Sequence, residues 1–232
     1  MDVLLVDDHA LFRDGLALLL SQHDSETQVH TCTTVAEALK YAEDHEDLDL
    51  ALLDYNLPDG NGLALLKELK GILPATPIAM LSGEEDPTLI QNSLNAGASG
   101  FITKTSTSDV MLSAVSLIMN GGMYIPPAIL AQRAPVAQPA VTSAGIEPTN
   151  ITADNASPNM APQSRQDYQL TERQKDVLRE MVKGLSNKEI AKELNMSPST
   201  VKVHVAAILR ELEVKNRTQV VALAQQQGLC DD

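Results

Sequence analysis

Short apolar runs in the first half of the chain end at polar side chains that together could do chemistry. These side chains are three carboxylates, a hydroxyl and an amine, namely Asp7, Asp8, Asp54, Ser82 and Lys104. The runs before them, at 3–6, 50–53, 78–81 and 101–102, have the continuous apolar character of parallel strands that are covered on both faces. Ligands of an open parallel sheet bind outside the carboxyl ends of its strands. We therefore expect the five side chains to converge at one edge of one sheet.

Three carboxylates held close together require a cation to balance their charge. Carboxylate and carbonyl oxygens are the ligands of a hard ion, and Mg²⁺ is the ion we expect. An amine and a hydroxyl beside such a site can receive the oxygens of a phosphoryl group, and Asp54, at the end of a central strand, is the natural nucleophile. Taken singly, Asp7 and Asp8 could be a helix cap and Lys104 a surface cation. The five matched positions together favour a phosphoryl-transfer site.

The elements that must position these residues alternate between strand-like and helix-like patterns over the first 122 residues. Strands are expected near 3–6, 28–31, 50–53, 78–81 and 100–102, and helices near 9–21, 35–45, 62–70, 87–96 and 107–120. This alternation predicts an α/β domain with a doubly wound, five-stranded parallel sheet and right-handed crossovers. The segment 57–62 (LPDGNG) has turn chemistry and is predicted to be a loop.

The charge of the chain is divided unevenly and indicates two parts with different partners. Residues 1–130 contain 19 acidic and 5 basic side chains, whereas residues 169–232 contain 9 acidic and 10 basic ones. We expect the acidic part to be held away from nucleic acid and the mildly basic part to be able to bind it. No apolar run has the length of a membrane span and no signal-peptide pattern is present, so we expect a cytoplasmic protein without a membrane partner. Cys32 and Cys230 have no metal-ligand spacing and are expected to be reduced.

The composition changes between the two parts. Residues 126–167 are rich in proline, alanine and small polar residues and are predicted to be a flexible linker. Four short helices are expected after it, near 172–183, 187–194, 198–212 and 217–227, with capping residues at their starts. Only residues 195–197 join the second helix to the third, which is a helix-turn-helix spacing. We therefore divide the chain into an α/β domain at 1–125, the linker, and a small all-α domain at 168–232.

The acidic half resembles the receiver domain of bacterial two-component response regulators, which has a flavodoxin-like fold. The resemblance rests on the Asp7-Asp8 pair, Asp54 with the LPDGNG segment behind it, Ser82 and Lys104, all in the family's order and spacing. It implies that Asp54 accepts a phosphoryl group from a sensor histidine kinase, that Lys104 pairs with this group and that Ser82 hydrogen-bonds to it. It also implies that Asp8, Asp54 and the backbone carbonyl of Asn56 hold Mg²⁺, with Asp7 assisting.

Three more residues of this half receive a role. Phe101 matches the family's switch aromatic, which is Tyr in many relatives, although it could simply be a core residue. Asn56 and Glu84 stand two residues after Asp54 and Ser82 and flank the route of a water that attacks the acyl phosphate. An amide and a carboxylate at these places resemble the fast-hydrolysing pattern of the chemotaxis receiver. The alternative is that both are loop residues facing solvent.

Helix 198–212 of the basic half has one apolar stripe and an outer face suited to a major groove. The stripe is Val201, Val205, Ile208 and Leu212, with Leu209 at its flank. The outer face is small and partly basic, and consists of Ser199, Lys202, Val203, Ala206 and Arg210. Lys188 is near a neighbouring helix terminus and could meet phosphates. A solvated face on a helical bundle is the alternative.

Residues 170–228 resemble the LuxR-type helix-turn-helix of the NarL/FixJ response regulators. The matching runs are 170–173, 184–191, 199–204 (STVKVH) and 217–218. The resemblance implies that helix 198–212 reads DNA, with Lys202, Val203 and Ala206 at base-facing positions. We expect the DNA contacts to include Lys188, Ser199, Thr200, Lys202, Val203, Ala206 and Arg210.

Both halves together predict a phosphorylation-controlled transcription regulator rather than an enzyme. Its expected partners are a cognate sensor kinase, promoter DNA and, in the active state, a second copy that pairs through helix 217–227. A phosphatase with an aspartyl nucleophile could use the same pocket, but the basic half and the absence of a second carboxylate at Asn56 disfavour it. A receiver that only dimerises, without phosphorylation, would not need the full acidic set. Whether the unphosphorylated receiver occludes the DNA-binding helix is left open by the sequence.

Overall fold

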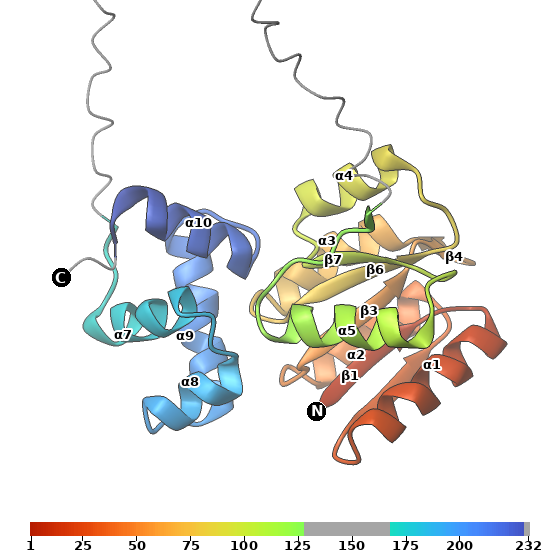
Figure 1. The fold of residues 1–232 in the computed structure, drawn as a ribbon, viewed down its shortest axis with the longest axis horizontal. Coiled ribbons are helices and arrows are strands. Elements are labelled where there is room, and N and C mark those ends of the chain that lie inside the picture. The colour runs from red at the N-terminus through yellow and green to blue at the C-terminus, as the bar shows by residue number, and fades with distance from the viewer. Residues whose placement is uncertain (128–167, 230–232) are drawn as a thin grey trace, which may run out of the picture.

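The computed structural model describes residues 1–127 and 168–229, which form two bodies that lie side by side (Figure 1). Residues 1–127 form an α/β body and residues 168–229 a smaller helical body. The predicted linker lies outside the described residues except for its first two positions, and so does Cys230. Cys32 is buried as a free thiol. Within the described ranges, no helix is long and apolar enough to cross a membrane.

The α/β body is built on a five-stranded parallel sheet in the order β2-β1-β3-β6-β7. The strands are β1 (Asp2–Val6), β2 (Gln28–Cys32), β3 (Leu50–Asp54), β6 (Ile78–Ser82) and β7 (Gly100–Thr103). The helices are α1 (Ala10–His23), α2 (Val35–Asp44), α3 (Gly62–Ile72), α4 (Pro87–Ala96) and α5 (Ser108–Met119). The predicted fold is confirmed, with every expected strand and helix of this half in place.

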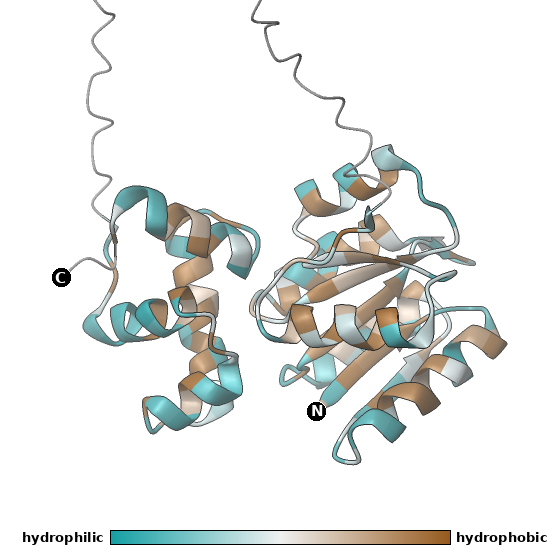
Figure 2. Ribbon diagram, in the orientation of Figure 1, coloured by the Kyte–Doolittle hydropathy of each residue, from teal (hydrophilic) through white to brown (hydrophobic). Residues whose placement is uncertain are grey.

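The central strands are buried on both faces, which explains their unbroken apolar sequences. Because alternate residues of a strand point to opposite faces, Leu4 and Leu53 join the core beneath α2, α3 and α4. Leu5 and Leu52 join the other core, beneath α1 and α5. Figure 2 shows these strands as a brown centre between the two layers of helices.

The loop predicted after β3 contains a small hairpin that its turn-rich sequence did not predict. β4 (Asn56–Leu57) and β5 (Gly60–Asn61) pair antiparallel across the turn at Pro58 and Asp59. The Asp59 carboxylate ties this turn to α2 by accepting hydrogen bonds from the backbone amides of Val35 (2.8 Å) and Ala36 (3.1 Å). Gly62 is required behind the hairpin, because a β-carbon there would collide with the carbonyl oxygen of Asp54. The hairpin therefore fixes the backbone beside Asp54.

The helical body contains α7 (Glu172–Val182), α8 (Asn187–Glu193), α9 (Pro198–Glu211) and α10 (Arg217–Gln227). The predicted capping boxes are present at Thr171 with Gln174 and at Ser186 with Glu189. Asn216 also caps its helix, but the Gln219 side chain accepts from the backbone amide of Lys215 and not from that of the cap residue. The predicted α9 stripe is buried in a core that belongs to this body, with Ala75 as the one α/β-body residue at its periphery.

Candidate acidic site and nucleic-acid interface

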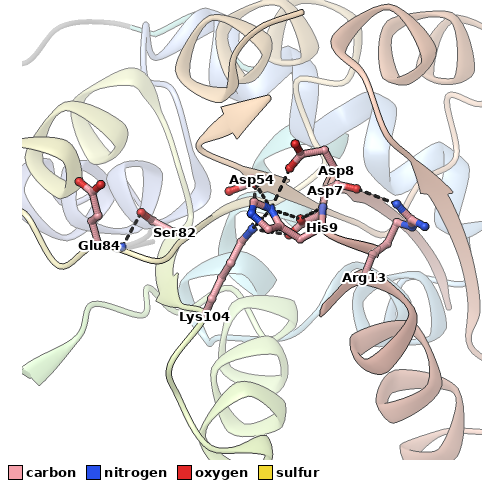
Figure 3. A network of polar contacts seen from close by, with 8 residues as sticks. All are labelled: Asp7, Asp8, His9, Arg13, Asp54, Ser82, Glu84 and Lys104. Carbon is pink, nitrogen blue, oxygen red and sulfur yellow. Dashed lines mark hydrogen bonds and ion pairs between the residues drawn. The ribbon is translucent and has the colours of Figure 1, made fainter. Parts of the chain in front are cut away.

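Asp7, Asp54 and Lys104 meet at the carboxyl edge of the sheet (Figure 3). Asp54 ends β3, Asp7 follows the neighbouring β1, and Lys104 follows β7. The Lys104 ammonium lies 2.7 Å from Asp7 Oδ2 and 2.8 Å from Asp54 Oδ2. The side chains of Asp7 and Asp54 are 0% and 3% exposed, and that of Lys104 is 13% exposed. Two carboxylates and an amine are thus held together with little water around them.

This environment shifts the pKa of Asp54. Burial raises the pKa of its carboxyl above the usual range, and the charge of Asp7 adds to the rise, while the hydrogen bond from Lys104 opposes it. Asp7 Oδ2 and Asp54 Oδ2 are buried and share the Lys104 ammonium as their ion-pair partner. Asp8 lies alongside with a more exposed carboxylate. These oxygens have lone pairs to spare and fit the ligand set of a hard divalent cation.

Ser82 and Glu84 lie apart from this cluster in the structure (Figure 3). Ser82 is buried at the end of β6, and its hydroxyl accepts a hydrogen bond from the backbone amide of Glu84 at 3.0 Å. The side chains of Glu84 and Asn56 belong to exposed residues. Phe101 is fully buried in the core beneath α2, α3 and α4. The roles of these four residues in phosphoryl transfer and switching therefore stay predictions.

His9 also belongs to the cluster, and it is not among the site residues predicted from the sequence. Its Nδ1 lies 2.8 Å from Asp8 Oδ1, 3.3 Å from Asp7 Oδ1 and 3.6 Å from Asp54 Oδ2. It precedes α1 as the N-cap residue, yet its side chain makes no capping hydrogen bond. A signal for it was present in the sequence, because an imidazole that directly follows two aspartates adds a common metal-ligand type to an acidic pair.

The outer face of α9 is largely free of side-chain packing within its own body. Val203 is 68% exposed, Ser199, Thr200 and Arg210 are exposed, and Ala206 is half-buried. Across from this face the α/β body forms the second wall of a cleft of about 980 Å³, lined by Ser199, Val203, Ala206 and Arg210 on one side and by α3 and the residues after it on the other. This volume is that of a pocket for one small ligand, so the cleft is too small for a DNA duplex.

Lys202 is predicted to contact bases, and in the structure it is bound to the α/β body. Its ammonium donates hydrogen bonds to the backbone carbonyls of Asp47 and Leu48 and lies 3.3 Å from Asp49 Oδ1. Lys188 lies 3.7 Å from the other carboxylate oxygen of Asp49. That oxygen also accepts a hydrogen bond from the backbone amide of Asp2 at 3.1 Å, which holds the carboxylate in place.

The start of α10 makes a second contact with the α/β body. The Lys215 ammonium donates to the carbonyl of Asn95 at 2.8 Å, and the Thr218 hydroxyl lies 3.4 Å from the carbonyl of Gly121. Asn216 is buried, and its amide nitrogen lies 3.5 Å from the carbonyl of Ala98. Residues of α8, of α9 and of the start of α10 are therefore in contact with the other body.

Comparison with known proteins matches a separate family model to each half of the chain. Residues 3–116 match the response regulator receiver domain, and residues 168–224 match the luxR family of bacterial regulatory proteins. The glycerol metabolism activator of Pseudomonas putida is 36% identical over 96% of this chain and 94% of its own length. The nitrate/nitrite response regulator protein NarL of Escherichia coli K12 is 30% identical over 98% of this chain and 96% of its own.

Solved structures agree with this comparison. A LuxR family DNA-binding response regulator from Silicibacter pomeroyi is 38% identical, and the match covers 55% of this chain and 98% of that one with a TM-score of 0.50. The RcsB response regulator of Salmonella typhimurium matches 97% of this chain and 98% of its own, with a TM-score of 0.52 and 20% identity. The latter likeness concerns the fold alone.

Proposed function

The chain belongs to the response regulators that join a receiver domain to a LuxR-type DNA-binding domain, and on this premise we propose that Asp54 is its phospho-acceptor. The protein is a transcriptional regulator of a two-component system and not an enzyme of the usual kind. In our proposal a sensor histidine kinase supplies the phosphoryl group. The phosphorylated protein then binds promoter DNA in the cytoplasm.

The observation that carries the proposal is the position of the Asp54 carboxylate. It is buried at the end of a central strand, with Lys104 at 2.8 Å and Asp7 beside it. An Asp54 oxygen forms a bond to the phosphorus of phosphohistidine while the bond between phosphorus and the histidine nitrogen breaks. Lys104 then balances the charge on the phosphoryl oxygens, and burial strengthens this attraction.

Asp8, Asp54 and the backbone carbonyl of Asn56, assisted by Asp7, are the residues that would hold Mg²⁺. The ion would supply positive charge against the oxygens of the group being transferred. Ser82 is to donate a hydrogen bond to the same group. Its oxygen accepts from the Glu84 amide, so its O–H hydrogen is still available for the new acceptor oxygens on Asp54.

Labelling with a small phosphodonor tests the assignment. We expect acetyl phosphate with Mg²⁺ to label the full chain, a chelator to prevent labelling, and Asp54→Asn to abolish it. Asp14→Asn is the matched control, because Asp14 is an exposed carboxylate of α1 with an ion pair to Arg13 alone. Equal labelling of Asp54→Asn and the control would remove Asp54 from the nucleophile role.

The contact between the two bodies supports a proposal for control. In the unphosphorylated state Lys202 is held by Asp49 and by two carbonyls, and the outer face of α9 looks into a narrow cleft. Such an arrangement is incompatible with α9 lying in a major groove. We infer that phosphorylation of Asp54 releases the helical body, which can then bind DNA.

Release would also free the start of α10. Lys215 and Thr218, at this start, are engaged with the α/β body. A helix that is free along its length can pair with the same helix of a second copy. We therefore propose that the released protein binds paired half-sites as a homodimer through α10.

A further inference from the structure

His9 occupies a place in the acidic cluster that the phosphoryl-transfer proposal leaves without a role. One potential ligand atom from each of Asp7, Asp8, His9 and Asp54 lies within 4.8 Å of all the others. The His9 Nδ1 is 2.8 to 3.6 Å from three carboxylate oxygens. Neighbouring ligands of an octahedral ion with bonds of about 2.1 Å are roughly 3.0 Å apart, so one ion can be reached by these atoms with only small movements of the side chains.

A second observation concerns the charge balance at this place. Asp7 Oδ2 and Asp54 Oδ2 are both buried and share one ammonium, that of Lys104, at 2.7 and 2.8 Å, so two buried carboxylates and the neighbouring Asp8 face a single lysine charge. The His9 imidazole is 65% exposed and makes no capping bond, and its Nδ1 contacts the carboxylates of the cluster and lies 3.4 Å from the Lys104 ammonium. Its backbone amide, in contrast, is fixed by a hydrogen bond of 2.8 Å to Asp7 Oδ1. The ring is therefore held at the cluster, with its Nδ1 on the side of the carboxylate oxygens.

We propose that His9 is a nitrogen ligand of the divalent ion held by Asp8 and Asp54, and that it lets this site take first-row transition ions such as Co²⁺ and Ni²⁺. The inference rests on the proposed function in taking the acidic cluster as the cation site. Carboxylates and carbonyls alone suit Mg²⁺, whereas an imidazole raises affinity for ions of intermediate softness. Sequence position 9 would thus set which metal the receiver accepts.

Binding of Co²⁺ and of Mg²⁺ to the full chain, measured by calorimetry without any phosphodonor, tests this. His9→Ala removes the imidazole from an exposed position. His45→Ala is the control, because the rings of His30 and His45 have centroids 6.2 Å apart and form another place where two imidazoles approach each other. Competition with Mg²⁺ identifies the Co²⁺ that is bound at the acidic cluster. Paramagnetically shifted proton signals of a Co²⁺-bound imidazole give a readout of nitrogen ligation that does not depend on affinity.

We expect His9→Ala to weaken Co²⁺ binding by about 10-fold or more. Loss of a residue that only hydrogen-bonds to a metal ligand already costs about 10-fold, and loss of a ligand itself should cost at least as much. Mg²⁺ binding should be nearly unchanged, the shifted imidazole signals should disappear, and His45→Ala should behave like the wild type. An unchanged ratio of Co²⁺ to Mg²⁺ affinity in His9→Ala would overturn the inference. Tighter binding of both ions would overturn it as well, because His9 would then compete with the ion.

Asp54→Asn separates failure of the inference from failure of the proposed function. If both ions bind wild type and variant alike, the cation site is not at Asp54, and the proposed site fails together with the role of His9. If binding depends on Asp54 but the metal preference does not depend on His9, only the inference fails.

Discussion

Replacing Asp49 by asparagine should open the contact between the two bodies and raise the DNA affinity of the unphosphorylated protein. The substitution removes the charge that faces Lys202 at 3.3 Å and Lys188 at 3.7 Å. The asparagine oxygen can still accept the hydrogen bond from the Asp2 amide, so the edge of the sheet should keep its shape. Lys202 would retain only the carbonyls of Asp47 and Leu48.

The expected change in the free energy of opening depends on how deeply the Lys202–Asp49 ion pair is buried. The side chains of Lys202 and Asp49 are 11% and 14% exposed. An exposed pair contributes about 0–1 kcal/mol, and breaking a fully buried pair costs about 3–5 kcal/mol. A value of about 2 kcal/mol lies between these limits and corresponds to a shift of roughly 30-fold in the equilibrium between closed and open forms. The apparent dissociation constant for DNA decreases as the open fraction increases, and its lower limit is the value of the free helical body.

Fluorescence anisotropy of a labelled duplex at fixed salt measures this, with full-length protein and no phosphodonor. Asp47→Asn is a closely matched control: it changes the net charge equally in the same loop, while Asp47 contacts Lys202 through its backbone carbonyl. We expect Asp49→Asn to bind up to roughly 30-fold more tightly than Asp47→Asn. The reasoning is refuted if both variants bind like wild type while the isolated helical body binds more tightly.

The isolated fragment 166–232, whose helices share a core of their own, should bind DNA without phosphorylation and lose affinity steeply as salt rises. In this fragment Lys202→Ala should cost about 1–3 kcal/mol on a preferred sequence and relax the preference, whereas Lys188→Ala should weaken all sequences alike. An unchanged preference in Lys202→Ala would exclude α9 as the reader. Bulkier or basic side chains at Asn56 and Glu84, both exposed, should lengthen the lifetime of the phosphoryl group without preventing phosphorylation. Decay after removal of the donor measures this, and wild-type decay in the double mutant would mean that hydrolysis is controlled elsewhere.

The sequence predicted the fold well because burial on both faces leaves a strong pattern. Strands such as Leu50–Asp54 consist of apolar residues up to the functional one, and helix starts such as that of α7 have capping boxes. The β4–β5 hairpin could not be predicted in the same way, because two residues in each strand are too few for a periodic pattern. Its turn chemistry was visible, but the pairing of Asn56 with Asn61 depends on the anchoring of Asp59 at α2.

The sequence predicted which residues lie at the site, because they follow the ends of parallel strands. It did not predict the contacts that depend on the direction in which a side chain points. Asp7, Asp54 and Lys104 meet because their strands are parallel and end at one edge. Ser82 sits at the same edge, yet its hydroxyl bonds to the Glu84 amide, a choice of rotamer that sequence does not encode directly. The sequence could not predict the partners of Lys202 either, because two of them are backbone carbonyls, which every residue has.

Charge alone cannot explain how phosphorylation would open this protein. The acidic body already attracts the basic one through Asp49, and a phosphoryl group adds about one to two further negative charges. Attraction between the bodies would increase, although screening limits it beyond about 8 Å. Release must therefore come from a local change of shape. β7 is suited to transmit it, since Lys104 follows one end, while Phe101 donates to the carbonyl of Tyr124 at 2.9 Å near the other. Ala98, two residues before that end, and Gly121, three residues before Tyr124, are among the residues that contact the start of α10.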